Sequence, residues 1–306
     1  MSERGFIPRE RRSGVPSKIV DHATPLLKER VRALFKQLPQ ALGGDEEAIH
    51  QMRVAGRRLR VALPLLAHKP RGRRVRRARR ILRDLTRSAG TSRDLDVSVA
   101  LLDERLKERG ELDAERRTLR QRLRAARGRS RTRMAEALMD IDIARVRRDL
   151  RAIVSRRAEL VFTALLRLRD ARDSRGTLIL QALEALGDRF DPAALHRLRI
   201  RLRRLRYAAE LAEKLTGQTT EAPVLFRELQ DVLGHVRDAH VLSSWMGRQA
   251  AAAVTRGQAA LAAAAREEEA HFLERSLEQH RSFLALSPGA TVRRGLEAMG
   301  ASRTAA

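Results

Sequence analysis

The spacing of hydrophobic and polar residues predicts helices along almost the whole chain. Apolar residues recur every three or four positions, and the alternating runs typical of strands are nearly absent. Leu, Ala, Arg and Glu, which favour helices, are abundant. We therefore predict an all-α protein. The expected helices lie near residues 18–38, 46–68, 72–88, 92–109, 111–127, 130–170, 177–187, 192–215, 222–235, 237–256, 257–286 and 290–300.

Proline, glycine and capping aspartates mark the expected helix boundaries. Breaks are predicted at residues 39–45, 69–70, 90, 110 and 175–176. The clearest helix start is Asp191 followed by Pro192, because aspartate caps a helix and proline fits the first helical position.

One basic helical signature occurs twice. His50 to Arg60 reads HQMRVAGRRLR and His196 to Arg206 reads HRLRIRLRRLR, with the His, Arg and RRLR elements at identical spacing. A second matched pair follows each copy: RDL at 83–85, Gly90, RD at 93–94 and Val97 correspond to REL at 227–229, Gly234, RD at 237–238 and Val241. This duplication predicts two helical halves, divided near residue 170 and packed as one unit.

Each signature forms a narrow basic stripe on its helix. Four residues of each copy project onto an arc roughly 80° wide: His50, Arg53, Arg57 and Arg60 in the first stripe, and His196, Arg199, Arg203 and Arg206 in the second. Apolar residues flank both stripes, whereas an ordinary amphipathic helix carries its charges on the broad face. Because burying unpaired arginines is costly, carboxylates or a bound anion must complete the stripes. We predict that they line a groove or channel.

Composition also indicates an anionic partner. The 306 residues carry a formal net charge of +26, with only six lysines among the 64 basic residues. Arginine matches phosphate oxygens with a planar fork. A GC-rich genome would explain arginine over lysine, but not the size of the excess. Apolar residues make up 43% of the chain, too many for a disordered basic protein.

Several classes of site and location are excluded or disfavoured. The chain has no cysteine, which excludes disulfides, zinc–thiolate sites and thiol catalysis. His235 and His240 lack a well-placed third ligand, so we expect no metal site and no cofactor. No apolar stretch is long enough to span a membrane. Residues 1–17 lack an apolar signal core and are expected to be a flexible basic tail on a cytoplasmic protein.

The remaining charged residues have weaker assignments. We expect Asp94, Asp96 and Asp238 to orient the stripe arginines from behind. Arg58 and Arg204 lie off the stripes and are expected to pair with acids on neighbouring helices. The basic run 71–80 is interpreted mostly as a solvated face, with phosphate binding or docking against the acidic segment 267–269 as alternatives.

Four motifs in order resemble the CHAD family, the conserved histidine α-helical domain. They lie at residues 49–60, 91–96, 195–207 and 229–234, and the resemblance spans roughly residues 18 to 285. It implies two four-helix bundles with pseudo-two-fold symmetry around a basic pore or groove, with a CHAD domain at 18–290 (halves 18–170 and 171–290). The segment 291–306 is then expected to be partly disordered.

The resemblance implies that the stripes bind inorganic polyphosphate without catalysis, in a standalone family member associated with polyphosphate granules. The implied binding residues are His50, Arg53, Arg57, Arg60, Arg93, His196, Arg199, Arg203, Arg206 and Tyr207. Gly56 and Ala89 depart from the family pattern, and Arg237 stands where Asn is frequent, which leaves its role open.

Two other functions compete with polyphosphate binding. A nonspecific nucleic-acid-binding or nucleoid-associated protein would use the same charge, but aromatic residues make up only 3% of the chain, which offers little for base stacking. A polyphosphate-processing enzyme would normally need clustered carboxylates for Mg²⁺, and the sequence shows none near the stripes.

Overall fold

A computed structural model describes residues 23–110, 113–155 and 161–301. Within these ranges every regular element is a helix, which confirms the all-α prediction. The expected tail at 1–17 and the expected first residues of the opening helix, 18–22, lie outside the described residues. Among the described helices, none is long and apolar enough to cross a membrane.

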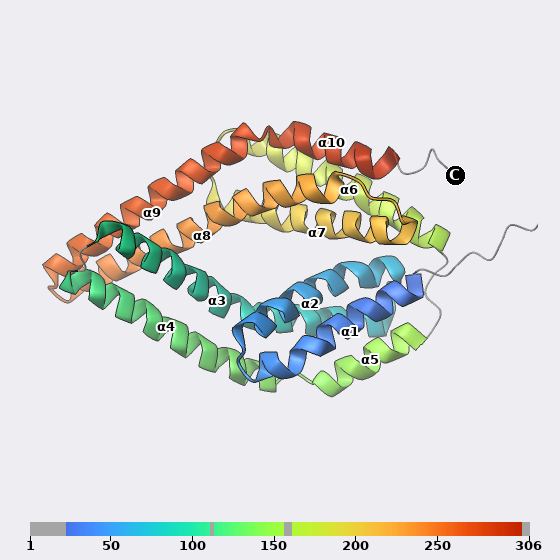
Figure 1. Ribbon diagram of the computed structural model, residues 1–306, viewed down its shortest axis with the longest axis horizontal. Coiled ribbons are helices and arrows are strands. Elements are labelled where there is room, and N and C mark those ends of the chain that lie inside the picture. Colours follow the sequence, from blue (N-terminus) through green and yellow to red (C-terminus); the bar gives the residue numbers. More distant parts are fainter. Residues whose placement is uncertain (1–22, 111–112, 156–160, 302–306) are drawn as a thin grey trace, which may run out of the picture.

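The described residues form ten helices. They are α1 (Ala23–Leu42), α2 (Glu46–Leu66), α3 (Arg73–Arg109), α4 (Ala114–Met139), α5 (Ile143–Ser155), α6 (Val161–Leu186), α7 (Pro192–Thr216), α8 (Ala222–Thr255), α9 (Ala259–Ala285) and α10 (Pro288–Ala301). The long helices α3 and α8 run along the molecule. With α4 and α9 they form one end, while α1, α2 and α5 lie opposite α6, α7 and α10 at the other (Figure 1).

The helices fall into two runs with the same order of neighbours. In the first run α2 packs against α1 and α3, and α3 against α4 and α5; in the second, α7 packs against α6 and α8, and α8 against α9 and α10. The runs meet where α2 contacts α7 and α3 contacts α8. The two signature helices, α2 and α7, are therefore neighbours.

Buried apolar side chains form three clusters. One holds α1, α2 and α5 with parts of α3, α4, α6 and α7. A second lies between α6, α7, α8, α9 and α10. A third joins the far halves of α3 and α8 to α4 and α9. This arrangement does not confirm a division into two four-helix bundles.

Two predicted helix breaks are wrong because glycine was given too much weight. Gly90 lies inside α3, and the expected break between residues 235 and 237 lies inside α8. A glycine in a helix interior costs only about 1 kcal/mol relative to alanine. The apolar residues of α3 and α8 that pack in two clusters each outweigh that cost.

The predicted helix at 130–170 is also wrong. It is interrupted after Met139, and α5 begins beyond Asp142, whose side chain accepts a hydrogen bond from the Arg145 amide at 2.7 Å. This cap is an N-terminal signal inside an otherwise helical pattern. Conversely, Gly176 does not end a helix, because it lies inside α6. A Cβ there would come within 2.6 Å of the Leu296 side chain, so this glycine allows α10 to approach α6.

The segment after residue 290 is more ordered than expected. It continues α10 to Ala301, and Val292 is fully buried against the cluster of α6 to α9. Residues 302–306 lie outside the described part of the chain.

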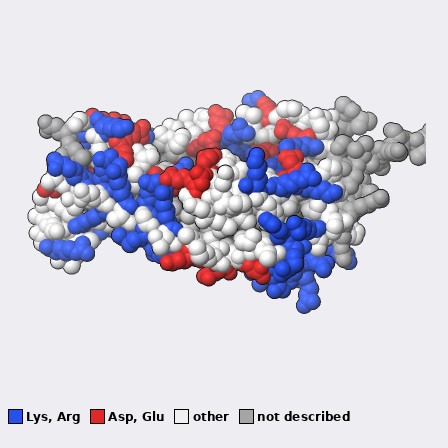
Figure 2. All heavy atoms as spheres, turned by 60° about the horizontal axis from the view of Figure 1, so that its bottom comes forward, with Lys and Arg blue, Asp and Glu red and all other residues white. Residues whose placement is uncertain are grey.

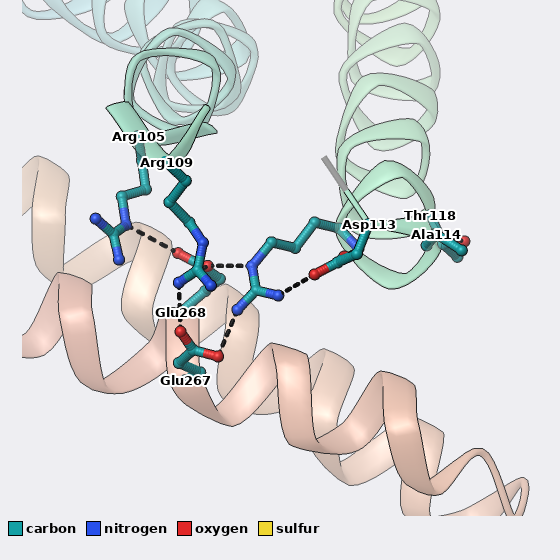
Figure 3. A network of polar contacts seen from close by, with 8 residues as sticks. Arg105, Arg109, Asp113, Ala114, Thr118, Glu267 and Glu268 are labelled. Carbon is teal, nitrogen blue, oxygen red and sulfur yellow. Dashed lines mark hydrogen bonds and ion pairs between the residues drawn. The ribbon is translucent and has the colours of Figure 1, made fainter. Parts of the chain in front are cut away.

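A buried ion-pair network ties α3, α4 and α9 together at the end of the molecule away from the signature helices (Figure 3). Glu268 is completely buried and accepts a hydrogen bond from the Arg116 guanidinium at 2.7 Å, with Arg105 at 3.5 Å. Arg109 and Arg116 both contact Glu267. Removing one partner from such a buried pair is strongly destabilising, so the network is structural.

This network contradicts docking of the basic run 71–80 on residues 267–269, because Glu267 and Glu268 are bound by arginines of α3 and α4. Within the run, Arg77 instead binds Asp149 of α5 through two hydrogen bonds of 2.5 Å.

Candidate functional site

Both signature helices begin at a capping aspartate placed five residues before the histidine. The Asp45 side chain accepts a hydrogen bond from the Ala48 amide at 2.7 Å. Asp191 accepts from the Ala193 and Ala194 amides at 2.9 and 3.0 Å, which confirms the predicted helix start. The caps fix where each helix begins, and therefore which face carries the stripe.

The first stripe, on α2, faces α3. Arg53 is only 6% exposed, and its Nη1 donates to the Ala89 carbonyl oxygen at 2.9 Å. Its buried Nε has no hydrogen-bond partner among the described residues. Arg60 reaches the Thr86 hydroxyl at 3.4 Å. Burial, reinforced by Arg57, lowers the pKa of Arg53 to about 10. These cations are held in the protein with few counterions.

The second stripe, on α7, packs against α8. The Arg199 guanidinium lies on the α8 backbone at Gly234, where an added Cβ would be 3.0 Å from Nη2. Burial, followed by the charges of Arg57 and Arg199, lowers the pKa of Arg203 to about 9. Arg57 of α2 and Arg203 of α7 line the same cavity, so the two stripes face each other there.

One end of the paired stripes opens into a cavity of about 630 Å³ between α2, α3, α6 and α7. Nine arginines line it, and among its described lining residues none is acidic. We call it the arginine cavity; its arginines are Arg57, Arg60, Arg79, Arg83, Arg87, Arg175, Arg201, Arg203 and Arg204. On the surface face shown in Figure 2, by contrast, acidic side chains lie between the basic patches.

Six of the nine cavity arginines were not among the predicted site residues. Arg79, Arg83 and Arg87 of α3 are spaced four residues apart and therefore share one helix face, a signal present in the sequence. Arg175 of α6 had no such signal. Arg204 was expected to pair with an acid, but it lines the cavity, and burial and the charge of Arg204 lower the pKa of Arg175.

Arg206, predicted to belong to the second stripe, is not among the residues that line the arginine cavity and lies against Glu210 and Tyr207. Its Nε is 3.5 Å from Glu210, and its guanidinium lies 5.0 Å from the centre of the Tyr207 ring. Arg58 approaches the same two residues, at 3.0 Å from Glu210 and 5.6 Å from the ring. The expectation that Arg58 pairs with an acid is thus met. Tyr207 is 5% exposed and lines the arginine cavity with its body packed in the core.

Three charged residues lie together at the opposite end of the stripes, where α3 meets α8. Arg237 holds Asp94 in a bidentate pair, with distances of 2.9 and 2.5 Å, and lies 3.5 Å from Asp238. We call these residues the carboxylate end. Burial raises the pKa of Asp238, opposed by the charges of Arg199 and Arg237. Asp94 and Asp238 are therefore contacted by Arg237, which links the two halves, and their expected role in orienting the stripe arginines stays a prediction.

Asp96 does not lie behind the stripe arginines as predicted. It binds Arg127 and Arg131 of α4, at 2.8 and 3.1 Å, and Glu46 of α2 contacts the same two arginines. Asp96 follows Asp94 by two residues, which is about 200° around a helix, so Asp96 faces α4 while Asp94 faces α8.

Both histidines are partly buried in a positive environment. Burial lowers the pKa of His50, and the positive charge of Arg93 lowers it further. Burial and then the positive charge of Arg237 lower the pKa of His196 in the same way. The buried Nδ1 of His196 has no hydrogen-bond partner in the described part of the chain. Arg93 is exposed on α3, where it acts on His50 through charge.

Comparison with known protein families decides the classification. The model of the CHAD domain matches residues 25–247, most of the chain. The chain belongs to the CHAD family. No curated protein matches it. Among the described residues, no group of three or more His, Asp or Glu side chains is placed to hold a metal ion.

Two solved structures have folds similar to that of this chain. The crystal structure of the CHAD domain from the plant Ricinus communis is 23% identical, with a TM-score of 0.61, over 90% of this chain and 91% of that one. PptA from Streptomyces chartreusis is 16% identical with the same TM-score of 0.61, over 87% of this chain and 98% of that one.

Proposed function

We propose that this CHAD protein binds inorganic polyphosphate, without catalysing a reaction, in the arginine cavity and along the two stripes that lead from it. The observation that carries the proposal is the cavity itself, where nine arginines from four helices face a space of about 630 Å³. Of these arginines Arg83 contacts a carboxylate, Asp84, at 3.2 Å, and phosphate oxygens would complete the guanidinium groups of the others. Granule association in the cytoplasm is the cellular setting we propose.

The pairing of the stripes supports a linear polyanion held from two sides. His50 to Arg60 covers roughly 15 Å of helix axis, enough for several phosphate units. The same order of neighbours in the two helix runs supports a pseudo-two-fold arrangement, with α2 and α7 contributing equivalent faces. Arginines bind phosphate but supply neither a nucleophile nor a general base at neutral pH, which supports binding without catalysis.

Nucleic-acid binding is the competing function, and the surroundings of Tyr207 count against it. Its ring is packed in the core with Arg58 and Arg206 within 5.6 Å of its centre, so it offers no free face for a base.

A competition titration at physiological salt tests the proposal. Labelled long-chain polyphosphate is bound first, and unlabelled polyphosphate, duplex DNA, single-stranded RNA and ATP are compared as competitors. We expect polyphosphate to compete at far lower phosphate concentration than the others. Equal competition by DNA or RNA would contradict the proposed function in favour of nucleic-acid binding.

Two glycines in equivalent positions test the role of Arg199. Gly234→Ala places a methyl group 3.0 Å from its guanidinium, whereas nothing lies within 4 Å of a Cβ at Gly90. Both changes favour the helix by about 1 kcal/mol. We expect Gly234→Ala to weaken polyphosphate binding roughly 10-fold, since a displaced guanidinium loses about 1.5 kcal/mol of charge-assisted hydrogen bonding. Isothermal titration calorimetry measures this, and Gly90→Ala serves as the matched control with unchanged affinity.

Binding is expected to strengthen as the pH falls. The pKa values of His50 and His196 are lowered in the free protein by burial and nearby arginines, so both rings are neutral at pH 7. A bound polyanion raises these pKa values, so binding takes up protons. Affinity should then increase by up to about 10-fold per histidine between about pH 7 and 5.5.

The measurement for this pH effect is the affinity of the wild type and of His50→Gln/His196→Gln over the same range. Titration of polyphosphate itself is common to both proteins and cancels in the comparison. An equally steep pH dependence in the double variant would show that the histidines do not contribute.

A further inference from the structure

The two ends of the proposed binding site differ sharply in charge. The arginine cavity has nine arginines and, among its described lining residues, no acid. The carboxylate end contains Asp94 and Asp238, with Arg237 between them and the charge of Arg199 also acting on Asp238. The electrostatic attraction for an anion therefore differs between the two ends of the site. A chain of identical phosphates would be bound more strongly at the arginine cavity than at the carboxylate end.

The carboxylates hold their positions through contacts across the molecule. Arg237 of α8 binds both oxygens of Asp94 of α3, and this pair joins the two helix runs. The Asp94, Arg237 and Asp238 side chains are each only 24 to 28% exposed. Arg237 is thus already engaged, and it does not offer a free guanidinium to a passing phosphate.

A phosphate chain running through this end would approach two carboxylates at close range. Arg237 neutralises part of this charge, but a phosphate passing here would still be repelled by carboxylates that are only partly exposed to solvent. In the arginine cavity, the same phosphate meets only cations. The free-energy profile along the site therefore favours a chain that enters the cavity and stops before the carboxylate end.

The chemistry of a chain terminus suits the cavity. A terminal phosphate has a second ionisation near pH 6, so it carries close to two negative charges at neutral pH, whereas an internal phosphate carries one. The densest positive charge of the site would thus face the densest negative charge of the ligand.

On the basis of the proposed function, we propose that the arginine cavity is an end-binding site: it holds one terminus of a polyphosphate chain, and the Asp94–Arg237–Asp238 cluster stops the chain from running through. Arg237 is then a positioning residue that holds Asp94 at the stop.

Stoichiometry distinguishes an end site from a through groove. Sedimentation equilibrium is run with size-fractionated polyphosphates of increasing length and saturating protein. A linear chain has two ends, so an end site predicts two proteins per chain at every length above a short minimum. Protein bound in proportion to chain length would overturn the inference. Failure to bind any length would overturn the proposed function itself.

Chains whose two terminal phosphates are both covalently blocked by bulky amines provide an independent measurement on the unaltered protein. We expect blocked chains to bind at least about 10-fold more weakly than unblocked chains of the same length, matching the loss of one charge-assisted contact or more. Equal affinity for blocked and unblocked chains would overturn the end site while leaving polyphosphate binding intact.

The stop itself is tested with Asp94→Asn/Asp238→Asn, after circular dichroism has shown that the variant keeps its helix content and cooperative unfolding. We expect the number of proteins per long chain to rise above two and blocked chains to regain affinity. A folded double variant that still binds two per chain would show that the carboxylates are not the stop. The blocked-chain measurement decides the end site if the variant does not fold.

Discussion

Replacing Arg57 and Arg203 together by glutamine is expected to abolish polyphosphate binding at physiological salt. The two residues come from opposite stripes, both line the arginine cavity, and the charge of Arg57 helps to lower the pKa of Arg203. A hydrogen bond to a charged group contributes about 1.5–3 kcal/mol. Loss of both arginines should therefore cost about 3–6 kcal/mol, which is about a 100- to 10,000-fold loss of affinity.

The matched control for this loss is Arg129→Gln/Arg133→Gln. Both residues are exposed on α4, away from the cavity, and the change in net charge is identical. Long-range attraction to a polyanion falls by the same amount in the two variants, so any difference reflects contact. Fluorescence anisotropy with labelled polyphosphate measures both. A similar small loss in the two variants would mean that net charge, and not the cavity, binds the polyanion.

Much of the fold was accessible from the sequence because helix formation here is local. The periodic apolar positions and the cap at Asp191 were sufficient to place α2 and α7 within a few residues. The errors arose where packing decided the outcome. At Gly90 the helix α3 continues because apolar residues on both sides of the glycine pack in buried clusters. At Gly176 the missing side chain allows α10 to approach α6 closely, which no local sequence pattern reveals.

The candidate site was accessible in part, for a related reason. The duplication predicted two equivalent basic helices, and α2 and α7 are neighbours in the structure. Pairings between distant helices did not follow. Nothing near Asp94 in the sequence identifies Arg237 as its partner, and nothing near Asp96 identifies Arg127. Predicting the cavity would have required recognising that Arg79, Arg83 and Arg87 share one face of α3. That regular spacing is hard to see because Arg79 lies within the dense basic run 71–80.

Replacing Arg203 alone by methionine is expected to stabilise the free protein while it weakens binding. The lowering of the Arg203 pKa from its usual value to about 9 arises first from burial and then from neighbouring arginines. At about 1.4 kcal/mol per pKa unit this corresponds to about 5 kcal/mol of unfavourable free energy, and solvent relaxation reduces the expected gain to about 2–3 kcal/mol. Methionine keeps much of the side-chain volume, so the gain is not lost to a cavity.

The sign of the pH dependence provides a second measurement on the same residue. Because the pKa of Arg203 is lower in the folded protein than in the unfolded chain, the contribution of this residue to stability should rise as the pH increases above about 9. Urea unfolding followed by circular dichroism should show this contribution in the wild type and not in Arg203→Met. Arg197→Met, an exposed change on the same helix, should shift stability by less than about 0.5 kcal/mol.

Saturating polyphosphate should narrow or reverse the stability difference between the wild type and Arg203→Met, because it pairs the buried cation only in the wild type. A ligand at 100 times its Kd adds about 2.7 kcal/mol to the stability of the folded state, which is close to the gain expected from removing the cation. A variant less stable than the wild type without ligand would mean that Arg203 has a structural partner, and would contradict its assignment to an anion site. The unfavourable free energy of burying the unpaired Arg203 cation in the free protein would therefore be offset when a polyanion binds and pairs with it.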